Sequence, residues 1–324
     1  MTKLETVATR LQQSSNILII THVCPDGDAL GSMLGLKIAL KNIDKNVTCF
    51  CADGMSDIFK FLPGSSSIKH EVLLGDFDLI VILDCGDCNR TGISDRIKEL
   101  SKIKNKIINI DHHPKNDLHR IAKYNFVDYD ASSTAEIIYE LIKIMHIKID
   151  KDIALCLLCG LYTDTGSFKH SSTTPKTLKI ASTLLQKGAR LKKITQNVIA
   201  NHSVSALHLW GIALKRLKIN AKYGIAVSAI TQEDLIACHA NDDDVSGIVN
   251  MINTVPQTKV ALFLFQKDKE TIKASIRTED DNVNLTKLAQ HFGGGGHRKA
   301  SGFVFSGKII INRNNFDINF ITNG

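Results

Sequence analysis

Short apolar runs rich in β-branched residues constrain the fold more than any other feature of the sequence. Each run is apolar throughout rather than at alternate positions, which is typical of strands buried on both faces. Helical patterns separate the runs, so the sequence predicts an α/β fold with a parallel sheet flanked by helices. The runs cover residues 16–22, 47–51, 78–84 and 106–111. The main helical patterns cover residues 29–43, 133–145, 151–163 and 176–187.

The chain has 324 residues, slightly more than one hydrophobic core usually serves, so we expect two domains. The first is expected over residues 1–190 and a helical connector with the only tryptophan, Trp210, over 191–218. A smaller α/β domain is expected over 219–324. Its strands are expected at 225–230, 259–266 and 271–277, and its helices at 232–239, 245–252 and 284–291. The tail after Ser306 is rich in Asn and only weakly patterned.

The composition is that of an ordinary globular protein, with 44% hydrophobic and 23% charged residues, which excludes a disordered or collagen-like chain. No apolar run approaches the roughly 18 residues of a membrane helix, and the first 15 residues lack an apolar signal core. Eight cysteines are too few for a disulfide scaffold, so we expect free thiols and a cytoplasmic location. The net charge of +7 suits an acidic substrate but equally fits a lysine-rich surface.

Acidic residues and histidines follow the three most clearly patterned strands, and one more aspartate lies at the end of an apolar helix. Because the carboxyl ends of parallel strands form the ligand crevice of an open sheet, these groups are expected to meet at one edge. They are His22, Asp26 and Asp28 after the first strand, Asp84 and Asp87 after the third, Asp111, His112 and His113 at the fourth, and Asp164 at the helix.

Carboxylates gathered in one crevice repel each other unless cations neutralise them. Mixed Asp and His ligands suit Mn²⁺, Fe²⁺ or Zn²⁺ better than Mg²⁺ or Ca²⁺. Two metals about 3.5–4 Å apart are the usual arrangement for phosphate-ester hydrolysis. A single member has a simpler explanation, since Asp28 before Ala29 could be a helix N-cap. Four such segments at corresponding positions of the fold favour the metal interpretation over four separate structural explanations.

Two Cys-x-x-Cys pairs, Cys85 with Cys88 and Cys156 with Cys159, lie too far apart for a zinc ribbon. We interpret the second pair as helix core, and favour a structural role for the first as well.

A run of four glycines, Gly293–Gly296, precedes His297 and Arg298. Such a run exposes backbone N–H groups to a phosphate, although an isolated run is more often a flexible loop. Arg277, in a chain with few arginines, is a second residue suited to clamp a phosphate.

Together these motifs resemble the DHH phosphoesterase superfamily, in its branch with a C-terminal DHHA1 domain. The resemblance rests on the Asp111-His112-His113 triplet and on the sets around His22, Asp84 and Asp164. It rests also on Ala131–Glu136 and on the segment from Gly293 to Gly302. Length and layout are most similar to bacterial oligoribonucleases that also dephosphorylate 3′-phosphoadenosine 5′-phosphate (pAp).

The resemblance implies two Mn²⁺ ions per chain. One would be held by His22, Asp26 and Asp84, and the other by Asp28, Asp84, His112 and Asp164, with Asp84 as the bridge. His113 would face the scissile phosphate and Asp111 would orient a histidine, with Asp87 as a further catalytic residue. The substrate-binding residues would be Arg90, Arg277, Gly294, Gly295, Gly296, His297 and Ser301. The resemblance and the Trp210 segment also suggest a homodimer.

The expected activity is hydrolysis of very short oligoribonucleotides to mononucleotides and of pAp to AMP, by two-metal activation of water. Two alternatives stay open. One is an exopolyphosphatase or pyrophosphatase with the same metal centre, and the other is a nucleotide-binding sensor without catalysis.

Overall fold

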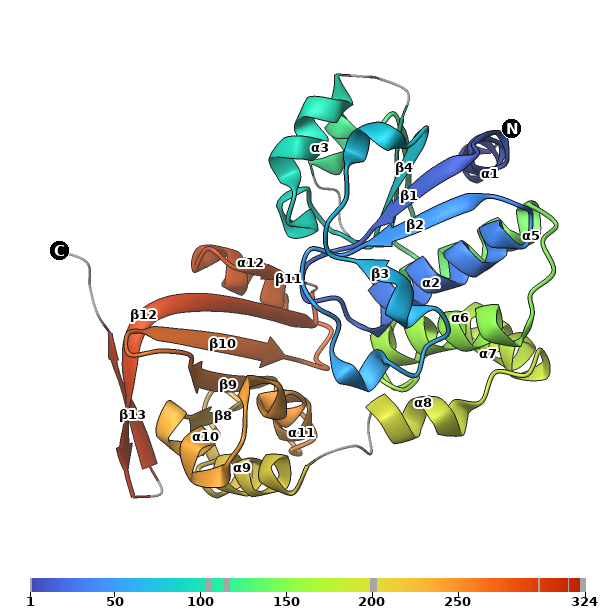
Figure 1. Cartoon of the computed structure of the whole chain (residues 1–324). Helices are drawn as coiled ribbons and strands as arrows, with labels where there is room; N and C mark the ends of the chain where they lie inside the picture. The colour runs from blue at the N-terminus through green and yellow to red at the C-terminus, as the bar shows by residue number, and fades with distance from the viewer. Residues whose placement is uncertain are drawn as a thin grey trace. The chain divides into compact units, whose positions relative to one another are not determined.

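The computed structural model describes residues 2–102, 106–113, 117–198, 203–296, 298–313 and 315–320. The chain forms two compact units, Met1–Asn201 and His202–Gly324 (Figure 1). The segment over residues 191–218 therefore contributes helix α8 (Leu191–Val198) to the first unit and α9 (Val204–Lys215) to the second. Within the described ranges, no helix combines the length and apolar character needed to span a membrane.

The first unit contains a six-stranded sheet in the order β3-β2-β1-β4-β5-β6, and every strand pair in it is parallel. The predicted α/β fold with a parallel sheet is therefore confirmed. The strands are β1 (Asn16–Ile20), β2 (Asn46–Phe50), β3 (Ile68–Lys69), β4 (Leu79–Leu83), β5 (Ile107–Asp111) and β6 (Tyr124–Val127). The sequence did not indicate the two edge strands, because β3 has two residues and β6 is only half-buried.

Helices cover both faces of this sheet, which explains why its central strands are apolar throughout. Ile17 and Ile19 of β1 pack into one hydrophobic cluster, and Leu18 and Ile20 pack into another on the opposite face. The helices are α1 (Lys3–Gln13), α2 (Gly27–Lys41), α3 (Ser94–Ser101), α4 (Leu118–Ile121), α5 (Thr134–Ile144), α6 (Lys151–Asp164), α7 (Pro175–Gln186) and α8. Short 3₁₀ turns are η1 (Asp57–Phe59), η2 (Ser65–Ser67), η3 (Leu74–Asp76) and η4 (Asn89–Thr91).

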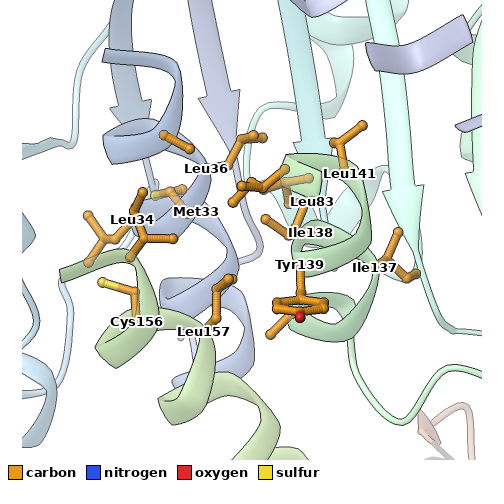
Figure 2. Close-up of a cluster of buried hydrophobic side chains, with 14 of the residues drawn as sticks. Met33, Leu34, Leu36, Leu83, Ile137, Ile138, Tyr139, Leu141, Cys156 and Leu157 are labelled. Atoms are coloured by element: carbon orange, nitrogen blue, oxygen red, sulfur yellow. The ribbon is translucent and has the colours of Figure 1, made fainter. Parts of the chain in front are cut away.

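Helices α2, α5 and α6 form the larger of the two clusters together with β1, β4 and β5 (Figure 2). Two glycines allow α2 and α6 to approach closely. A Cβ atom on Gly31 would lie 2.4 Å from the carbonyl oxygen of Cys156, and one on Gly160 would lie 2.7 Å from Oδ1 of Asp28. This contact brings the beginning of α2 beside the end of α6, where predicted metal ligands lie.

The strand order reverses at β1: β2 and β3 are added on one side of it, and β4, β5 and β6 on the other. In an open parallel sheet, the chain leaves two such neighbouring strands in opposite directions and opens a crevice at their carboxyl ends. The loops after β1, β4 and β5 all begin at this edge.

The second unit contains a mixed sheet in the order β11-β12-β10-β9-β8-β7, with β13 paired to β12. Its strands are β7 (Lys218–Asn220), β8 (Ile225–Ile230), β9 (Val260–Gln266), β10 (Thr271–Arg277), β11 (Gly295–Gly296), β12 (Ala300–Asn312) and β13 (Asn315–Phe320). Its helices are α9, α10 (Gln232–Cys238), α11 (Ile248–Ile252) and α12 (Leu285–His291), with the 3₁₀ turn η5 (Asp242–Val245).

The sequence analysis left the tail after Ser306 without an element, but residues 307–312 complete β12 and residues 315–320 form β13. The two strands pair antiparallel from Gly307 with Phe320 to Asn312 with Asn315. Ile309 and Phe316 are buried in a small hydrophobic cluster against the sheet. The alternation of apolar residues was present in the sequence, but Asn and Asp at the exposed positions and the hairpin turn obscured it.

Candidate metal centre

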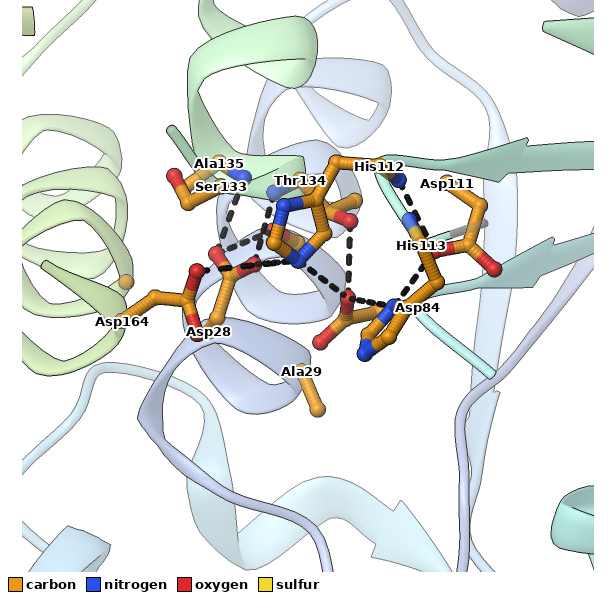
Figure 3. Close-up of polar contacts among 12 residues, drawn as sticks. Asp28, Ala29, Asp84, Asp111, His112, His113, Ser133, Thr134, Ala135 and Asp164 are labelled. Atoms are coloured by element: carbon orange, nitrogen blue, oxygen red, sulfur yellow. Dashed lines mark hydrogen bonds and ion pairs between the residues drawn. The ribbon is translucent and has the colours of Figure 1, made fainter. Parts of the chain in front are cut away.

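Histidines and aspartates from five segments of the first unit meet at the carboxyl edge of its sheet. Figure 3 shows the part of this cluster around Asp28, Asp84 and Asp164. Within this cluster, three groups have ligand atoms that all lie within 4.8 Å of one another. They are His22 with Asp26 and Asp84, Asp28 with His112 and Asp164, and Asp84 with His112 and His113. Every residue that the sequence analysis named as a metal ligand belongs to at least one of these groups.

Asp84 lies at the centre of the cluster, directly after β4. Its carboxylate is buried, and its two oxygens face different histidines. Oδ2 lies 4.0 Å from Nε2 of His22, whereas Oδ1 lies 3.6 Å from Nε2 of His112. The φ angle of Asp84 is 58°, in the left-handed region that a residue with a Cβ rarely adopts. Such strain is concentrated at functional sites, where the surrounding structure maintains it.

The beginning of α2 supplies two carboxylates with different roles. Asp26 is the N-cap residue, since its Oδ1 accepts hydrogen bonds from the backbone of Asp28 and Ala29 at 3.0 Å each. Its Oδ2 lies 4.0 Å from Nε2 of His22. The N-cap explanation considered for Asp28 therefore applies to Asp26 instead, and Asp28 is buried in the first turn.

Asp28 is held by the amino-terminal end of helix α5. Its Oδ2 accepts a hydrogen bond from the backbone N–H of Thr134 at 2.6 Å, and its Oδ1 accepts one from Ala135 at 2.9 Å. The Thr134 hydroxyl also donates to Oδ1 of Asp84 at 2.8 Å. The start of a helix favours negative charge, so α5 stabilises two carboxylates of the cluster.

The loop of His22 fixes the orientation of its ring. Its Nδ1 lies 2.8 Å from the carbonyl oxygen of Val23, which assigns the proton to Nδ1. Its Nε2 is buried and has no hydrogen-bond partner within the described part of the chain. A buried imidazole nitrogen with a lone pair and a backbone-anchored second nitrogen is the arrangement found in metal-binding histidines.

The electrostatics of the cluster also indicate a cation. Burial raises the pKa of Asp28 well above its ordinary value, and repulsion from Asp84 and Asp164 raises it further. Burial likewise raises the pKa of Asp164, and repulsion from Asp26 and Asp84 adds to this effect. Divalent cations would relieve this repulsion, and the oxygen and imidazole donors fit an ion such as Mn²⁺.

Asp111 lies behind the two histidines that follow it. Its Oδ1 accepts hydrogen bonds from the backbone of His112 at 2.8 Å and of His113 at 3.0 Å, and it lies 2.7 Å from Nδ1 of His113. Burial lowers the pKa of His113, but the hydrogen bonds to Asp111 and Asp84 outweigh it and raise the pKa to about 11. Asp111 therefore fixes the ring of His113 at the edge of the cluster.

Asp87 and Arg90 lie in the turn after β4. Oδ1 of Asp87 accepts a hydrogen bond from the backbone of Arg90 at 3.1 Å, and Asp87 belongs to none of the three groups. The Arg90 guanidinium lies beside Gly86, at 3.1 Å from where a Cβ would be, and the His113 ring lies 3.8 Å from the same point. The structure thus places Arg90 near His113 and gives Asp87 a hydrogen bond within the turn.

The predicted substrate-binding residues of the second unit lie along three strands. Arg277 ends β10, where its Nε donates to Oδ1 of Asn250 at 3.1 Å. Gly295 and Gly296 form β11, which pairs with Gly302 and Ser301 of β12.

Half of the glycine run forms an edge strand, since Gly295 and Gly296 make up β11 and the two glycines before them lie outside it. A Cβ on Gly294 would lie 2.2 Å from the carbonyl oxygen of Gly302, so this contact requires glycine. Ser301 is buried beneath this edge. His297 lies outside the described residues.

Thr134 is the residue of the site that sequence reasoning missed. The segment Ala131–Glu136 carried the resemblance but was given no role. A signal was available, because Ser133 followed three residues later by Glu136 before an apolar run marks a helix start. The Ser133 hydroxyl does accept a hydrogen bond from the Glu136 backbone at 3.2 Å. What the sequence could not show is that this helix start faces Asp28.

The four cysteines of the two Cys-x-x-Cys pairs are buried free thiols. Burial raises the pKa of Cys88 to about 11 and that of Cys85 and Cys156 well above its ordinary value. A high pKa opposes the thiolate form that binds metals. Among the residues that the structure describes, no cysteine belongs to a metal-binding group.

The parallel sheet with its acidic and histidine cluster defines a phosphoesterase of the DHH class, a hydrolase of phosphate esters. The chain belongs to the DHH family: residues 16–161 match the DHH family, N-terminal domain, and residues 223–315 match the DHHA1 domain.

Several bacterial proteins match most of the chain. A protein of Thermus thermophilus named bifunctional oligoribonuclease and PAP phosphatase NrnA is 33% identical over 90% of this chain and 84% of its own length. A protein of the same name from Mycoplasma genitalium is 27% identical over 93% of this chain and 92% of its own. The crystal structure of an exopolyphosphatase-related protein from Bacteroides fragilis is 30% identical, with a TM-score of 0.84 over 93% of this chain and 90% of that one.

Proposed function

We propose that this chain is a manganese-dependent phosphoesterase that hydrolyses very short oligoribonucleotides to mononucleotides and pAp to AMP. The observation that carries the proposal is the position of Asp84, whose two carboxylate oxygens face His22 and His112 separately. A carboxylate between two imidazole-containing groups is suited to bridge two cations. The names of the Thermus and Mycoplasma relatives support the substrate class.

The cations would be held by two sets of residues that share Asp84. The first set is His22, Asp26 and Asp84, and the second is Asp28, Asp84, His112 and Asp164. The ligand atoms of the first set lie within 4.8 Å of one another, and so do those of Asp28, His112 and Asp164 in the second. Asp84 joins the second set through its Oδ1, which lies 3.6 Å from Nε2 of His112. Two bound cations supply a water molecule of lowered pKa and neutralise the charge on the phosphoryl oxygens.

The protein's own groups would position the ligands and the phosphate. The start of α5 fixes Asp28 and Asp84 through the backbone of Thr134 and Ala135 and the Thr134 hydroxyl. His113, oriented by Asp111, would donate a hydrogen bond to a phosphoryl oxygen, and Arg90 would contact the same phosphate. In the reaction, water forms a bond to phosphorus and the ester P–O bond breaks, with a proton passing to the leaving alcohol.

The second unit would hold the rest of the nucleotide. We assign this role to Arg277, to Ser301 and to the backbone of the glycine strand, with His297 as a further member. Arginine presents a planar pair of donors to a phosphate, and glycines allow a phosphate to approach the backbone. We also propose a cytoplasmic location, because all eight cysteines are free thiols, which fits a reducing compartment.

The test is a substrate and metal panel. The protein is stripped with EDTA, reloaded with Mn²⁺, Mg²⁺ or Zn²⁺, and assayed with a ribonucleotide dimer, pAp, polyphosphate and pyrophosphate. We expect activity on the dimer and pAp, highest with Mn²⁺, and about two Mn²⁺ per chain by elemental analysis. Turnover of polyphosphate or pyrophosphate alone would replace the proposal with the inorganic-phosphate alternative. Nucleotide binding without turnover under every metal would make the chain a sensor.

A further inference from the structure

The loop between β1 and α2 carries two candidate metal ligands, His22 and Asp26, with only three residues between them. Nε2 of His22 lies 4.0 Å from Oδ2 of Asp26, so both side chains face the same point. The chain must turn sharply between them to allow this. Cys24 makes the turn, with a φ angle of 50°. The orientation of both ligands therefore depends on the conformation of Cys24.

Cys24 adopts this conformation against two local preferences. A positive φ angle brings the Cβ atom of an ordinary residue too close to the following carbonyl oxygen. In addition, Pro25 follows, and the ring of a proline restricts the residue before it to extended backbone with a φ angle of about −120°. Contacts from outside the loop must therefore maintain the turn, as is usual for strained residues at functional sites.

Two neighbouring segments hold the residues that precede this turn. The buried thiol of Cys51, directly after β2, donates a hydrogen bond to the carbonyl oxygen of His22 at 3.3 Å. The backbone N–H of Val23 donates to the carbonyl oxygen of Arg90 at 2.7 Å. These contacts fix the path of the loop as it leaves β1.

Asp53 holds the strained residue itself. It lies three residues beyond the end of β2, at the carboxyl edge of the sheet. Its Oδ2 accepts a hydrogen bond from the backbone N–H of Cys24 at 3.1 Å and another from the thiol of Cys24 at 3.3 Å. In the described part of the chain, Asp53 belongs to none of the three groups of candidate ligands. Its carboxylate therefore serves the loop rather than a cation.

We propose that Asp53 is a positioning residue of the metal centre. By holding Cys24 in its left-handed conformation, Asp53 sets His22 and Asp26 at the separation that the first cation requires. This inference rests on the proposed function, which assigns that cation to His22, Asp26 and Asp84.

The effect of Asp53 is expected to be confined to the first cation. Asp28 follows the loop closely, but the backbone N–H groups of Thr134 and Ala135 hold its carboxylate separately. His112 follows β5 and Asp164 ends α6, so neither depends on this loop. Loss of the Asp53 contact is therefore expected to weaken the binding of one of the two cations, not of both.

The first test measures Mn²⁺ binding to EDTA-stripped protein by isothermal titration calorimetry, which requires no turnover. Groups that orient metal ligands change metal affinity 10- to 100-fold, so Asp53→Ala is expected to raise the dissociation constant of one Mn²⁺ by about 10-fold or more. Asp53→Asn keeps an oxygen acceptor for the N–H of Cys24 and is expected to stay within about threefold of the wild type. If Asp53→Asn weakens binding as much as Asp53→Ala, the charge of Asp53 and not its hold on the loop is responsible, and the proposal is wrong.

Asp78 provides the matched control. It is also an exposed aspartate of the first unit that accepts backbone hydrogen bonds, from Ser15 at 2.8 Å and from Asn16 at 3.1 Å. It lies directly before β4, at the opposite edge of the sheet. Asp78→Ala is expected to lower the melting temperature and to leave both Mn²⁺ affinities unchanged. Equal losses of affinity for Asp53→Ala and Asp78→Ala would overturn the proposal, because general destabilisation would then explain both.

The second test relieves the strain instead of restraining it. Glycine has no Cβ atom and adopts positive φ angles readily. The double variant Asp53→Ala/Cys24→Gly is therefore expected to bind the weakened Mn²⁺ about threefold more tightly than Asp53→Ala does. Binding no tighter than that of Asp53→Ala would refute the role of Cys24.

The wild type separates this inference from the function on which it rests. A wild type that binds two Mn²⁺, together with an Asp53→Ala variant that binds both as tightly, would overturn the positioning role alone. A wild type that binds no Mn²⁺ would contradict the proposed function and this inference with it.

Discussion

The hydroxyl of Thr134 offers a sharp test of how the cluster is held together. It is fully buried and donates a hydrogen bond to Oδ1 of Asp84 at 2.8 Å, while the backbone N–H of the same residue binds Asp28. Thr134→Val keeps the shape of the side chain and removes the donor. Thr134→Ser keeps the donor and removes a methyl group. The pair therefore separates hydrogen bonding from packing.

The size of the effect follows from the charge of the acceptor. Hydrogen bonds to charged groups contribute about 1.5–3 kcal/mol. If Asp84 orients both cations, losing that amount in the transition state lowers kcat/KM by about 10- to 150-fold, at 1.36 kcal/mol per factor of ten. This range agrees with the 10- to 100-fold loss typical of groups that orient metal ligands. Thr134→Ser is expected to stay within about threefold of the wild type, which is less than 1 kcal/mol.

A matched control lies in the same unit. Thr177 is also fully buried and donates its hydroxyl to a carboxylate, Oε2 of Glu136, at 3.0 Å. That carboxylate pairs with Lys176 rather than with the candidate metal ligands. Thr177→Val should lower the melting temperature but leave Mn²⁺ content and kcat/KM near those of the wild type.

Steady-state kinetics on pAp, Mn²⁺ analysis and thermal melting are measured for all three variants. An active Thr134→Val protein would show that Asp84 needs no support from this hydroxyl. Equal losses for Thr134→Ser and Thr134→Val would assign the role to the methyl group.

Four further predictions concern the metals, the thiols, the second unit and pH. Asp84→Ala should abolish turnover and leave at most one Mn²⁺ per chain, so two tightly bound ions by elemental analysis would contradict the bridging role. Replacing Cys156 and Cys159 with Ala and Val should leave metal content and activity nearly unchanged, whereas loss of a zinc equivalent from a folded protein would reveal a metal role. Arg277→Ala should lower activity on a short RNA or pAp at least 10²-fold, about 2.7 kcal/mol, and much less on a small chromogenic phosphodiester; equal losses on both substrates would mean that the residue shapes the metal centre. Burial raises the pKa of Glu136, but its hydrogen bonds and its lysine partner outweigh burial and hold the pKa below 4.5. The ionised carboxylate therefore stabilises the fold above that pH. This contribution disappears as the pH falls through the lowered pKa. In urea unfolding, Glu136→Gln should therefore be destabilised at pH 7, with the gap to the wild type shrinking below about pH 4; a gap independent of pH would refute this.

The sequence predicted the central strands well because burial on both faces leaves an unmistakable pattern. The run at 78–84 became β4 (Leu79–Leu83), and the run at 106–111 became β5 (Ile107–Asp111). Edge elements were harder to predict, since a strand such as β6 (Tyr124–Val127) is half-buried and alternates weakly. The β12–β13 hairpin was missed for the same reason, because only one face of each strand packs on the core.

The clustering of the acidic residues and histidines that follow the strands could also be predicted, because parallel topology brings strand ends together whatever the intervening sequence. The roles within it were less readable. Nothing in the sequence shows that Asp26 rather than Asp28 caps α2, since both precede the same apolar run. Likewise Asp87 follows Asp84 closely enough in the sequence to join the cluster, yet its carboxylate accepts a hydrogen bond from the backbone of Arg90 instead. Such choices depend on side-chain direction in a turn, which a residue pattern does not specify.

Glycines of α2, rather than the candidate ligands themselves, explain how Asp28 and Asp164 come close together. Gly27, Gly31 and Gly35 recur every four residues and so lie on one face of α2. That face packs on α6, where a Cβ on Gly31 would meet the backbone oxygen of Cys156 at 2.4 Å. A backbone atom inside a helix cannot move aside without its helix, so any side chain at Gly31 would push the two helices apart. Because Asp28 begins one helix and Asp164 ends the other, the distance between these two carboxylates depends on the absence of that side chain.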